Sequence, residues 1–185
     1  LVNEPIIHKY LAITTRPDGT VYTDSEFQER FKNVRAHPRT WLVTGCAGFI
    51  GSHLVEALLK LDQKVIGLDN FATGSRANLE AIRRAVGPER AARFTFIEGD
   101  IRSRENCEAA LSHGVDAVLH QAALGSVPRS IKDPVTSNDV NVSGTVNLFN
   151  VAQGHGIKRV VYASSSSVYG ENPELPRRES QHCEP

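Results

Sequence analysis

The chain has 185 residues, with 21 basic and 21 acidic side chains and a formal net charge of zero at pH 7. This balance gives no general electrostatic attraction to nucleic acid or to an anionic membrane, so we expect neither as a partner. An apolar fraction of 40% with 23% charged residues is typical of a folded globular protein. No apolar run approaches the ~20 residues that span a bilayer.

The cysteines indicate the compartment. Cys46, Cys107 and Cys183 lie far apart and form neither a CxxC pair nor a zinc-site spacing. An odd number of separated cysteines is typical of a reducing compartment, so we expect a cytoplasmic protein with no metal site. The sequence contains no methionine and begins at Leu1, which suggests a piece of a longer chain.

Residues 1–38 are expected to form an N-terminal extension. The segment from Arg16 to Gly19 lies between two apolar runs and is typical of a hairpin turn. Ser25 and Gln28 have the spacing of a capping box and predict a short helix to about Asn33. Two interpretations stay open, a loosely attached extension and an element that binds a partner.

From residue 39 onward, strands and helices alternate. Predicted strands cover residues 41–44, 64–69, 94–97, 115–120 and 159–163. Predicted helices cover residues 49–60, 76–86, 104–111 and 135–153, with Gly87-Pro88 ending the second. Short, continuously apolar strands indicate burial on both faces, as in a parallel sheet covered by helices. We therefore predict an α/β fold with a doubly wound parallel sheet, a Rossmann domain, over residues 39–185.

A glycine-rich turn joins the first predicted strand to the first predicted helix. Gly45, Gly48 and Gly51 form the pattern GxxGxxG. They suit, in order, a tight turn, the approach of a pyrophosphate to the backbone, and close packing of the helix on the strand. Phe49 and Ile50 open the helix, whose N-terminus attracts phosphate groups. These five residues are predicted to bind a dinucleotide.

An acid follows the second predicted strand. Asp69 lies about 20 residues beyond the glycines, where a carboxylate binds ribose hydroxyls, and Asn70 follows it. A carboxylate there repels a 2′-phosphate, so NAD is favoured over NADP. Arg76 is the only cation nearby in the sequence that weakens this preference. A turn that merely packs a helix, with a chance acid, stays open as the alternative.

Two residues within these motifs are interpreted as structural. Cys46, inside the glycine-rich turn, is expected to fill a small space rather than act as a reactive thiol. His120 ends an apolar strand and has no obvious partner acid in the sequence. We therefore expect it to be a hydrogen-bonded structural group.

Four further segments accompany the glycine pattern in a fixed order. They are Gly99-Asp100-Ile101, His120-Gln121-Ala122-Ala123, Asn141-Val142-Ser143-Gly144-Thr145, and the run from Ser164 to Gly170. Together with GxxGxxG they resemble the extended short-chain dehydrogenase/reductase family, over about residues 39–185. The resemblance implies NAD as cofactor. It also implies further cofactor-binding residues, namely Asp100, Ile101, Gln121, Ala122, Ala123, Asn141, Ala163 and Ser164.

The serine run separates chemistries within that family. Nucleotide-sugar dehydratases carry an acid pair just before Val-Tyr-Gly, and decarboxylases a glutamate, where this chain has Ser166 and Ser167. The resemblance therefore implies 4-epimerisation, in which NAD takes a hydride from sugar C4 and returns it to the opposite face. It implies Ser165 as the catalytic serine that positions the sugar hydroxyl, with its neighbours Ser164 and Ser166 as alternatives.

The segment from Ala122 to Ile131 resembles the UDP-N-acetylglucosamine 4-epimerases of polysaccharide synthesis. A small Gly125-Ser126 would leave room for an acetamido group. The substrate-binding residues implied are Gly125, Ser126, Val127, Ser165 and Ser166. A UDP-glucose or UDP-glucuronate 4-epimerase stays open, as does the interpretation that Gly125, Ser126 and Pro128 merely shape a loop.

The base of the family's mechanism is a Tyr-x-x-x-Lys pair, and no tyrosine of this sequence has a lysine four residues on. By the family's spacing the pair would fall just beyond Pro185. We therefore expect no turnover from these residues alone, and a non-catalytic NAD-binding module such as a redox sensor stays open. The resemblance also implies a homodimer of the parent protein, paired through the helix at residues 135–153.

Overall fold

The structure is a computed structural model that describes residues 24–171, 173, 175–178 and 180–183. It divides into two compact units. One is Arg35–Tyr162, and the other holds the described residues up to Val34 and those from Ala163 onward. The hairpin predicted around residues 16–19 lies outside the described residues.

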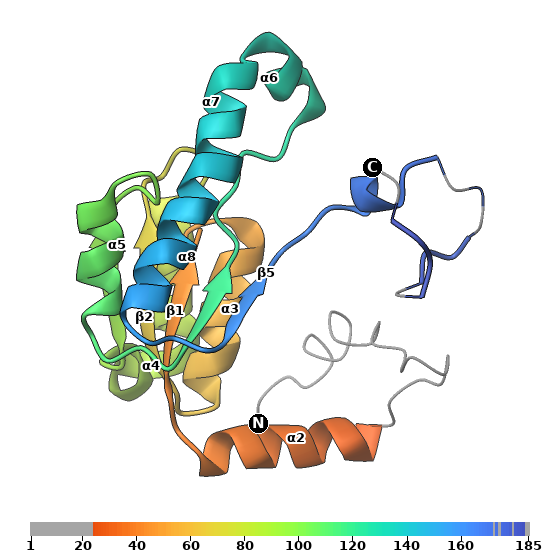
Figure 1. Ribbon diagram of the computed structural model, residues 1–185. Helices are drawn as coiled ribbons and strands as arrows, with labels where there is room; N and C mark the ends of the chain where they lie inside the picture. Colours follow the sequence, from red (N-terminus) through yellow and green to blue (C-terminus); the bar gives the residue numbers. More distant parts are fainter. Residues whose placement is uncertain (1–23, 172, 174, 179, 184–185) are drawn as a thin grey trace. The chain divides into compact units, whose positions relative to one another are not determined.

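The larger unit is built on a parallel sheet of five strands. Their bounds are β1 (Thr40–Thr44), β2 (Lys64–Asp69), β3 (Phe94–Glu98), β4 (Ala117–His120) and β5 (Val160–Tyr162). The strand order is β3-β2-β1-β4-β5, and every neighbouring pair is parallel (Figure 1). The predicted α/β fold class is therefore confirmed. The order reverses between β1 and β4, and ligands of open α/β sheets bind at the carboxyl edge of such a reversal.

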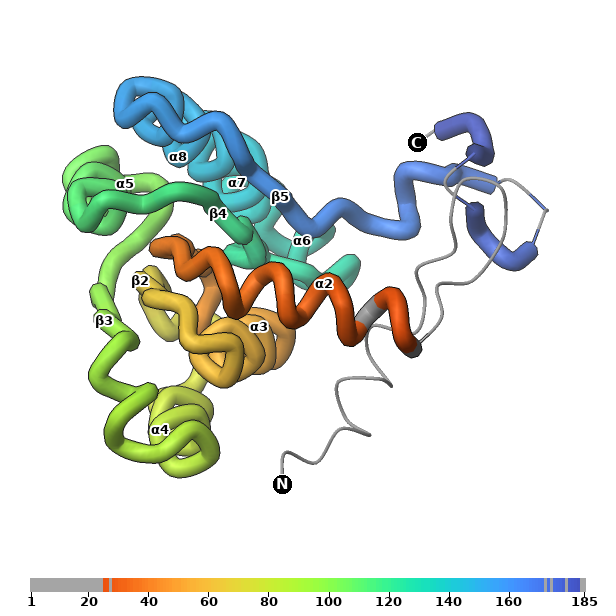
Figure 2. Tube along the Cα trace, turned by 90° about the horizontal axis from the view of Figure 1, so that it is seen from below, coloured from red at the N-terminus to blue at the C-terminus, as the bar shows by residue number. Residues whose placement is uncertain are grey.

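Helices cover both faces of this sheet. Helices α3 (Phe49–Lys60) and α4 (Arg76–Ala91) lie on one face. Helices α5 (Arg104–Leu111) and α8 (Thr145–Gly154) lie on the other, as Figure 2 shows along the strands. Each face has its own apolar core, and the two cores do not share residues.

Alternation along the strands builds the two cores. In β2, Val65 packs under α3 and α4, whereas Ile66 and Leu68 pack under α5 and α8. All three side chains are fully buried. Burial on both faces explains why the strands read as continuous apolar runs rather than as alternating ones.

Helix ends match the sequence prediction where local signals decide them. Helices α3 and α5 and strand β2 have the predicted bounds. Helix α2 (Asp24–Ala36) begins one residue before the expected Ser25 and runs past Asn33. The predicted stop at Gly87-Pro88 is only partly right. Gly87 leaves the helix with φ 78°, but the chain then makes another helical turn to Ala91, because Pro88 is compatible with a first helical turn.

Three helical features were not predicted. The long helix over residues 135–153 is interrupted, since α7 (Pro134–Asn138) and α8 are joined by the π-helical segment η1 (Asp139–Gly144). The segment before it holds a short helix, α6 (Val127–Lys132), which Ser126 caps by accepting the backbone N–H of Arg129. A 3₁₀ turn, η2 (Ser166–Tyr169), lies in the smaller unit. None of the helices in the described part of the chain is both long and apolar enough to span a bilayer.

Candidate functional site

The glycine-rich turn lies at the carboxyl end of β1, where the strand order reverses. The Gly45 N–H donates to the carbonyl of Leu68 in β2 at 2.8 Å, and the Gly48 N–H donates back to the carbonyl of Gly45 at 3.0 Å. Gly48 is the N-cap of α3 and has no side chain to close the helix end. The first turn of α3 therefore presents backbone N–H groups and the positive end of the helix dipole, which suits a phosphate group.

Two of the turn's glycines are required by close backbone approaches. Gly45 has φ 67°, and a Cβ there would lie 2.8 Å from the backbone nitrogen of Ala122. A Cβ on Gly51 would lie 2.1 Å from the carbonyl oxygen of Gly45. Because neither neighbour is a flexible side chain, the turn accepts only hydrogen at both positions. This is the role expected for Gly51, and it is buried.

The carboxylate of Asp69 holds the turn from β2. It is buried, and its two oxygens accept the backbone N–H groups of Ala47 at 2.9 Å and Phe71 at 2.7 Å. Phe71 has φ 59°, and the bond from its N–H to Asp69 stabilises this left-handed conformation. Asp69 thus connects the glycine-rich turn to the loop after β2, and it also lines the pocket described below.

Arg76, the cation near Asp69 in the sequence, binds other groups. The Arg76 guanidinium donates to Glu98 at 2.7 Å and lies 4.3 Å from the centroid of the Phe71 ring. It does not line the pocket. Its contacts therefore leave the preference set by Asp69 for an unphosphorylated ribose intact.

A charged cluster lies after β3. Arg102 donates to Asp100 from Nε at 3.1 Å and from Nη2 at 2.8 Å, and from Nη1 to Asp139 at 3.0 Å. Asn70 donates to the same Asp100 carboxylate at 2.8 Å. The Arg102 guanidinium is the main cause that lowers the pKa of Asp100 to about 2, so this carboxylate stays charged at any physiological pH.

A chain of hydrogen bonds, buried at Thr44 and His120, joins β1, β4 and the long helix. Thr44 Oγ1 accepts the backbone N–H groups of Gln121 and Ala122, each at 3.2 Å, so its own proton goes to His120 Nδ1 at 2.6 Å. His120 Nε2 then donates to Thr145 Oγ1 at 2.9 Å, and Thr145 donates to the Asn141 carbonyl at 2.8 Å.

This network settles the role of His120. Burial lowers its pKa to about 4, so the ring is neutral and acts as both a donor and an acceptor. The interpretation of His120 as a hydrogen-bonded structural group is confirmed. Its effect is to fix the carboxyl ends of β1 and β4 against η1 and α8.

The segment after β4 is held by the long helix. Asn141 accepts the backbone N–H of Leu124 at 2.8 Å through its side-chain oxygen, and donates to the Leu124 carbonyl at 3.1 Å. Asn141 was predicted to bind the cofactor, but it does not line the pocket. In the structure its contact with that region is indirect, through the backbone that it positions.

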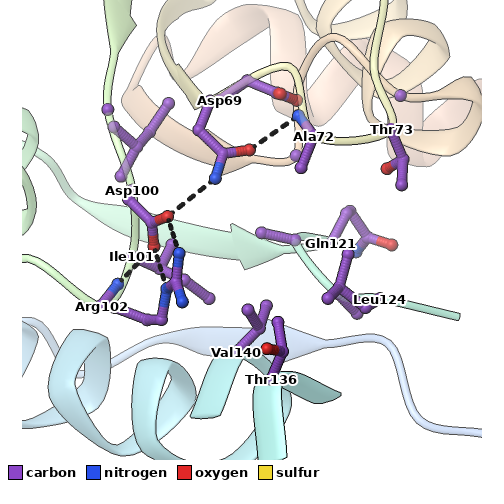
Figure 3. A pocket seen from close by; sticks show the side chains of 17 residues that line it. Asp69, Ala72, Thr73, Asp100, Ile101, Arg102, Gln121, Leu124, Thr136 and Val140 are labelled. Carbon is purple, nitrogen blue, oxygen red and sulfur yellow. Dashed lines mark hydrogen bonds and ion pairs between the residues drawn. The ribbon is translucent and has the colours of Figure 1, made fainter. Parts of the chain in front are cut away.

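These segments enclose one pocket of about 170 Å³ at the carboxyl edge of the sheet. Figure 3 shows Asp100 and Arg102 on its β3 side, Thr136 and Val140 from the long helix, and Gln121 and Leu124 beyond β4. Small-molecule sites usually occupy about 300–1,000 Å³, so the pocket has room for only part of a ligand as large as a dinucleotide. Its lining residues are Gly45, Gly48, Leu68, Asp69, Asn70, Ala72, Thr73, Gly99, Asp100, Ile101, Arg102, Gln121, Ala122, Ala123, Leu124, Thr136 and Val140.

Apart from Asn141, whose cofactor role stays a prediction, the predicted cofactor residues divide into three groups. Nine of them line the pocket, namely Gly45, Gly48, Asp69, Asn70, Asp100, Ile101, Gln121, Ala122 and Ala123. Phe49, Ile50 and Gly51 belong to the first turn of α3 and do not line it; Phe49 and Ile50 are exposed by 65% and 57%. Ala163 and Ser164 lie in the smaller unit, and their role stays a prediction.

None of the predicted substrate residues is among those that line the pocket. Gly125 and Val127 flank Ser126, the cap of α6, and none of the three lines the pocket. Ser165 and Ser166 are exposed in the smaller unit, where Ser165 caps η2 by accepting the backbone N–H of Ser167 at 3.2 Å. The catalytic role of Ser165 and the substrate role of Ser166 stay predictions.

Sequence reasoning missed Arg102, which lines the pocket and donates to both Asp100 and Asp139. The signal that could have found it is an acid and an arginine two residues apart, directly after a strand. Thr136 and Val140 were missed because no sequence motif indicated that their face of the helix turns toward the strands. Thr73 and Leu124 carried no signal beyond their place in loops.

The two buried cysteines are inert. Burial is the main cause that raises the pKa of the Cys46 thiol far above its usual range, and it raises the pKa of Cys107 to about 11. The space-filling role expected for Cys46 is confirmed, since its side chain is fully buried in the core under α3. Within the described ranges, no three His, Cys, Asp or Glu side chains are arranged to hold a metal ion.

Taken together, the doubly wound sheet, the glycine turn against a helix start, and the acid after β2 define a dinucleotide-binding α/β protein. Comparison with known proteins narrows this class. Residues 41–185 match the NAD dependent epimerase/dehydratase family, and the chain belongs to that family. NAD is the family's cofactor, and the predicted resemblance is confirmed.

Three relatives illustrate the match. A UDP-glucose 4-epimerase of Klebsiella pneumoniae is 40% identical over 140 residues, which are 75% of this chain and 98% of that one. A UDP-glucose-4-epimerase structure from Stenotrophomonas maltophila, with bound NAD and formylated UDP-arabinopyranose, has a TM-score of 0.72 and 36% identity, covering 78% of this chain and 42% of that one. A UDP-N-acetylglucosamine 4-epimerase from Methanobrevibacter ruminantium M1, in complex with UDP-N-acetylmuramic acid, has a TM-score of 0.68 and 37% identity, covering 80% and 44%.

The chain spans less than half of most of these proteins. Four other curated relatives, all named as 4-epimerases, are covered over only 36% to 44% of their length.

Proposed function

We propose that the chain is the NAD-binding portion of a nucleotide-sugar 4-epimerase. The observation that carries this proposal is the pocket at the reversal of strand order, lined by two glycines of the turn and by Asp69 and Asp100. The named 4-epimerases among its relatives support the choice of reaction.

The residues at the pocket fit NAD. The turn leaves no room for a Cβ at Gly45 and Gly51, and the start of α3 offers N–H groups to a diphosphate. The carboxylate of Asp69 suits ribose hydroxyls rather than a 2′-phosphate. When bound, NAD supplies a reversible hydride acceptor for sugar C4. The chain's own part in this region is to bind and orient the cofactor and to exclude water from it.

Ser165 is proposed to orient the C4 hydroxyl of the sugar. Its hydroxyl donates to Ser167 at 3.0 Å, and it also accepts from the Ser167 backbone. Ser164 and Ser166 remain its alternatives. In this role a serine holds the hydroxyl in line for proton removal by a separate base, and the sugar passes through a transient 4-keto form.

The preferred sugar is proposed to be UDP-N-acetylglucosamine, interconverted with UDP-N-acetylgalactosamine. Gly125 has an ordinary backbone conformation, and a Cβ built there meets no described atom within 4 Å. The described fold therefore does not require glycine at this position, which supports a role in leaving room for a substrate group. Ser126 and the proline after Val127, in contrast, have a local role at the start of α6.

UDP-glucose is the second candidate substrate, and the names of several relatives favour it equally. Steady-state rates of the complete gene product carrying these residues, with both sugars, distinguish the two. We expect the N-acetylated sugar to have the higher kcat/KM. We expect Gly125→Leu to reduce kcat/KM for the N-acetylated sugar and to leave kcat/KM for UDP-glucose unchanged. Equal kcat/KM values for the two sugars in the unmodified protein, or a loss for both sugars in the variant, would reject the proposed role of Gly125.

The 185-residue polypeptide by itself is proposed to bind NAD without turnover, because it contains no Tyr-x-x-x-Lys pair. Pure material incubated with NAD and either UDP-sugar should release no epimerised product above the level of a blank. Detectable conversion would disprove this part of the proposal.

A homodimer is proposed through the long helix. Val135, Val142 and Val146 expose 77%, 54% and 61% of their surface there, an unusual density of exposed apolar side chains. Light scattering of the complete gene product should give twice the chain mass.

Cytoplasmic location is proposed as well, since all three cysteines are free thiols.

A further inference from the structure

A second cavity, of about 220 Å³, lies at the amino edge of the sheet, opposite the edge that holds the pocket. Three basic residues line this amino-edge cavity from neighbouring strands, since Arg39 precedes β1, Lys64 begins β2 and Arg93 precedes β3. The Lys64 N–H donates to the Arg39 carbonyl, and the Val65 N–H donates to the Arg93 carbonyl, each at 3.0 Å. The three basic residues are therefore attached side by side, about 5 Å apart from strand to strand.

The two acids that line the amino-edge cavity are already bound by the chain. The Asp62 carboxylate pairs with Arg90 at 3.0 Å and with Arg35 at 3.6 Å. Asp116 accepts the backbone N–H of Thr40 at 2.8 Å. Together with the three basic residues that line the cavity, five basic side chains share these two carboxylates. The amino-edge cavity therefore has an excess of positive charge.

The three basic side chains that line the cavity differ in what they bind. Arg93 Nη1 donates to the Asp62 carbonyl at 2.7 Å, just after α3, where a cation complements the helix dipole. Over the described residues, the side chains of Arg39 and Lys64 make no hydrogen bond or ion pair. Lys64 is exposed and Arg39 is partly buried. Like charges on adjacent strands repel each other, and an anion bound between them would relieve this repulsion.

We propose that the amino-edge cavity binds a short chain of phosphate groups, a linear triphosphate. Arg39 and Lys64 supply the free donors, and Arg93 adds a third positive charge. The row of three basic residues extends over about 10 Å, which suits several linked phosphates better than a single one. Asp116, just before the next strand β4, ends the row, so a long nucleic-acid strand is not the ligand that fits.

This site is separate from the one proposed for NAD, because the two cavities share no lining residue. The same triphosphate chemistry occurs in the free inorganic chain and in a nucleoside triphosphate. The experiment therefore uses both as ligands, with the NAD pocket occupied and empty.

The deciding experiment is calorimetric titration of the complete gene product with inorganic tripolyphosphate, in 0.15 M salt without divalent cations. We expect a dissociation constant below about 1 mM. Orthophosphate should bind at least about ten-fold more weakly, because it reaches fewer of the basic side chains. Saturating NAD should leave the affinity for tripolyphosphate unchanged.

Neutral variants test the two free donors. Arg39→Gln and Lys64→Gln should each weaken tripolyphosphate binding about five-fold, the upper range for a partly exposed ion pair. Arg83→Gln is the matched control, since it removes the same charge from an exposed position of α4 outside the cavity. It should leave the affinity unchanged. Lys64 is exposed, so Lys64→Gln keeps the test decisive if Arg39→Gln proves unstable.

ATP, titrated with NAD present, distinguishes the two sources of the ligand. Equal binding of ATP and tripolyphosphate, with the same loss in Lys64→Gln, would support the site and identify a nucleotide as its ligand. Binding of tripolyphosphate alone would support the site and identify the free chain.

Four results would overturn the proposal. They are no saturable binding of tripolyphosphate, displacement of tripolyphosphate by NAD, full affinity in both cavity variants, and a loss in Arg83→Gln equal to that in Lys64→Gln. None of them bears on whether the protein binds NAD. Conversely, a protein that binds tripolyphosphate but not NAD would reject the proposed function and leave this inference standing.

Discussion

The two ends of the pocket are held by different forces. At the glycine-rich turn the contacts are steric and buried, as with Gly51 against the Gly45 carbonyl and Asp69 against two backbone N–H groups. After β3 the contacts are between charged and partly exposed side chains, Asp100, Arg102 and Asp139. Buried contacts of the first kind tolerate no change of shape, whereas charged contacts near water can exchange partners at small cost. We therefore expect the glycine-rich turn to be rigid and the charged side chains after β3 to rearrange more easily.

Gly51→Ala should give the largest effect, because it places a Cβ where the Gly45 carbonyl already lies. We expect unfolding free energy to fall by about 3–4 kcal/mol, the upper range for overpacking. Urea denaturation followed by circular dichroism measures it. Gly154→Ala is the matched control in α8, where a Cβ would meet no described atom within 4 Å, and it should be neutral or slightly stabilising. Equal stability of both variants would show that the glycine-rich turn is not sterically constrained at Gly51.

His120 should make the buried end sensitive to acid. Its pKa of about 4 in the fold lies below the ordinary 6.5, so between these values the unfolded chain binds the proton and the folded chain does not. Its contribution is complete above pH 6.5 and is lost as the pH falls toward 4, by at most about 3 kcal/mol.

The measurement is unfolding free energy at pH 7, 6 and 5, for the unmodified chain and for His120→Asn. The variant should be less stable at pH 7 and should show a shallower fall with acid. His113→Asn, at an exposed position, should keep the slope of the unmodified chain. A slope unchanged by His120→Asn would show that other groups carry the acid response.

Thr44→Val keeps the shape of the side chain and removes the hydroxyl that serves Gln121, Ala122 and His120. Leaving buried His120 and the two partly buried backbone N–H groups unpaired should cost about 2 kcal/mol of unfolding free energy. Thr44→Ser retains the hydroxyl and should recover more than half of this loss. Equal losses in the two variants would mean that the methyl group, and not the hydrogen bonds, supports the site.

Glu98→Gln should give the smallest effect and tests the adjustable side of the comparison. It weakens the exposed Arg76–Glu98 pair, whose side chains are 66% and 55% exposed. We expect a change below about 0.5 kcal/mol at 0.15 M salt. A loss above about 1 kcal/mol in the same denaturation assay would indicate that charged contacts beside β3 are as rigid as the turn.

The sequence predicted those parts of the fold that local chemistry decides. Helix α5 begins at its cap Ser103, and β2 ends at Asp69, so their bounds follow from capping and apolar runs. The positions of Gly45, Gly51 and Asp69 followed from known backbone requirements of a dinucleotide turn. These are features in which a residue's role depends on its near neighbours in the chain.

Other features depend on contacts that no local pattern encodes. The π-helical segment η1 coincides with Asn141 bonding the backbone of Leu124 and with Asp139 bonding Arg102, both over long sequence separations. Helix α6 could have been predicted, since Ser126 followed by a proline within the first helical turn is a start signal. The cluster around Asp100 could not, because it includes Asn70, thirty residues earlier.

The π-helical segment also bears on which insertions and deletions the protein can accept. An i→i+5 turn takes up one residue more than an α-helical turn, and each residue of an α-helix rotates the chain by about 100°. Deleting one residue between Asp139 and Gly144 would remove the extra residue and leave a regular helix whose two ends keep their phase. Thr136 would then stay at the pocket while α8 kept its packing on the sheet. The same deletion inside α8 would instead rotate everything before it by about 100°, so the π-helical segment is where this helix tolerates the loss of one residue best.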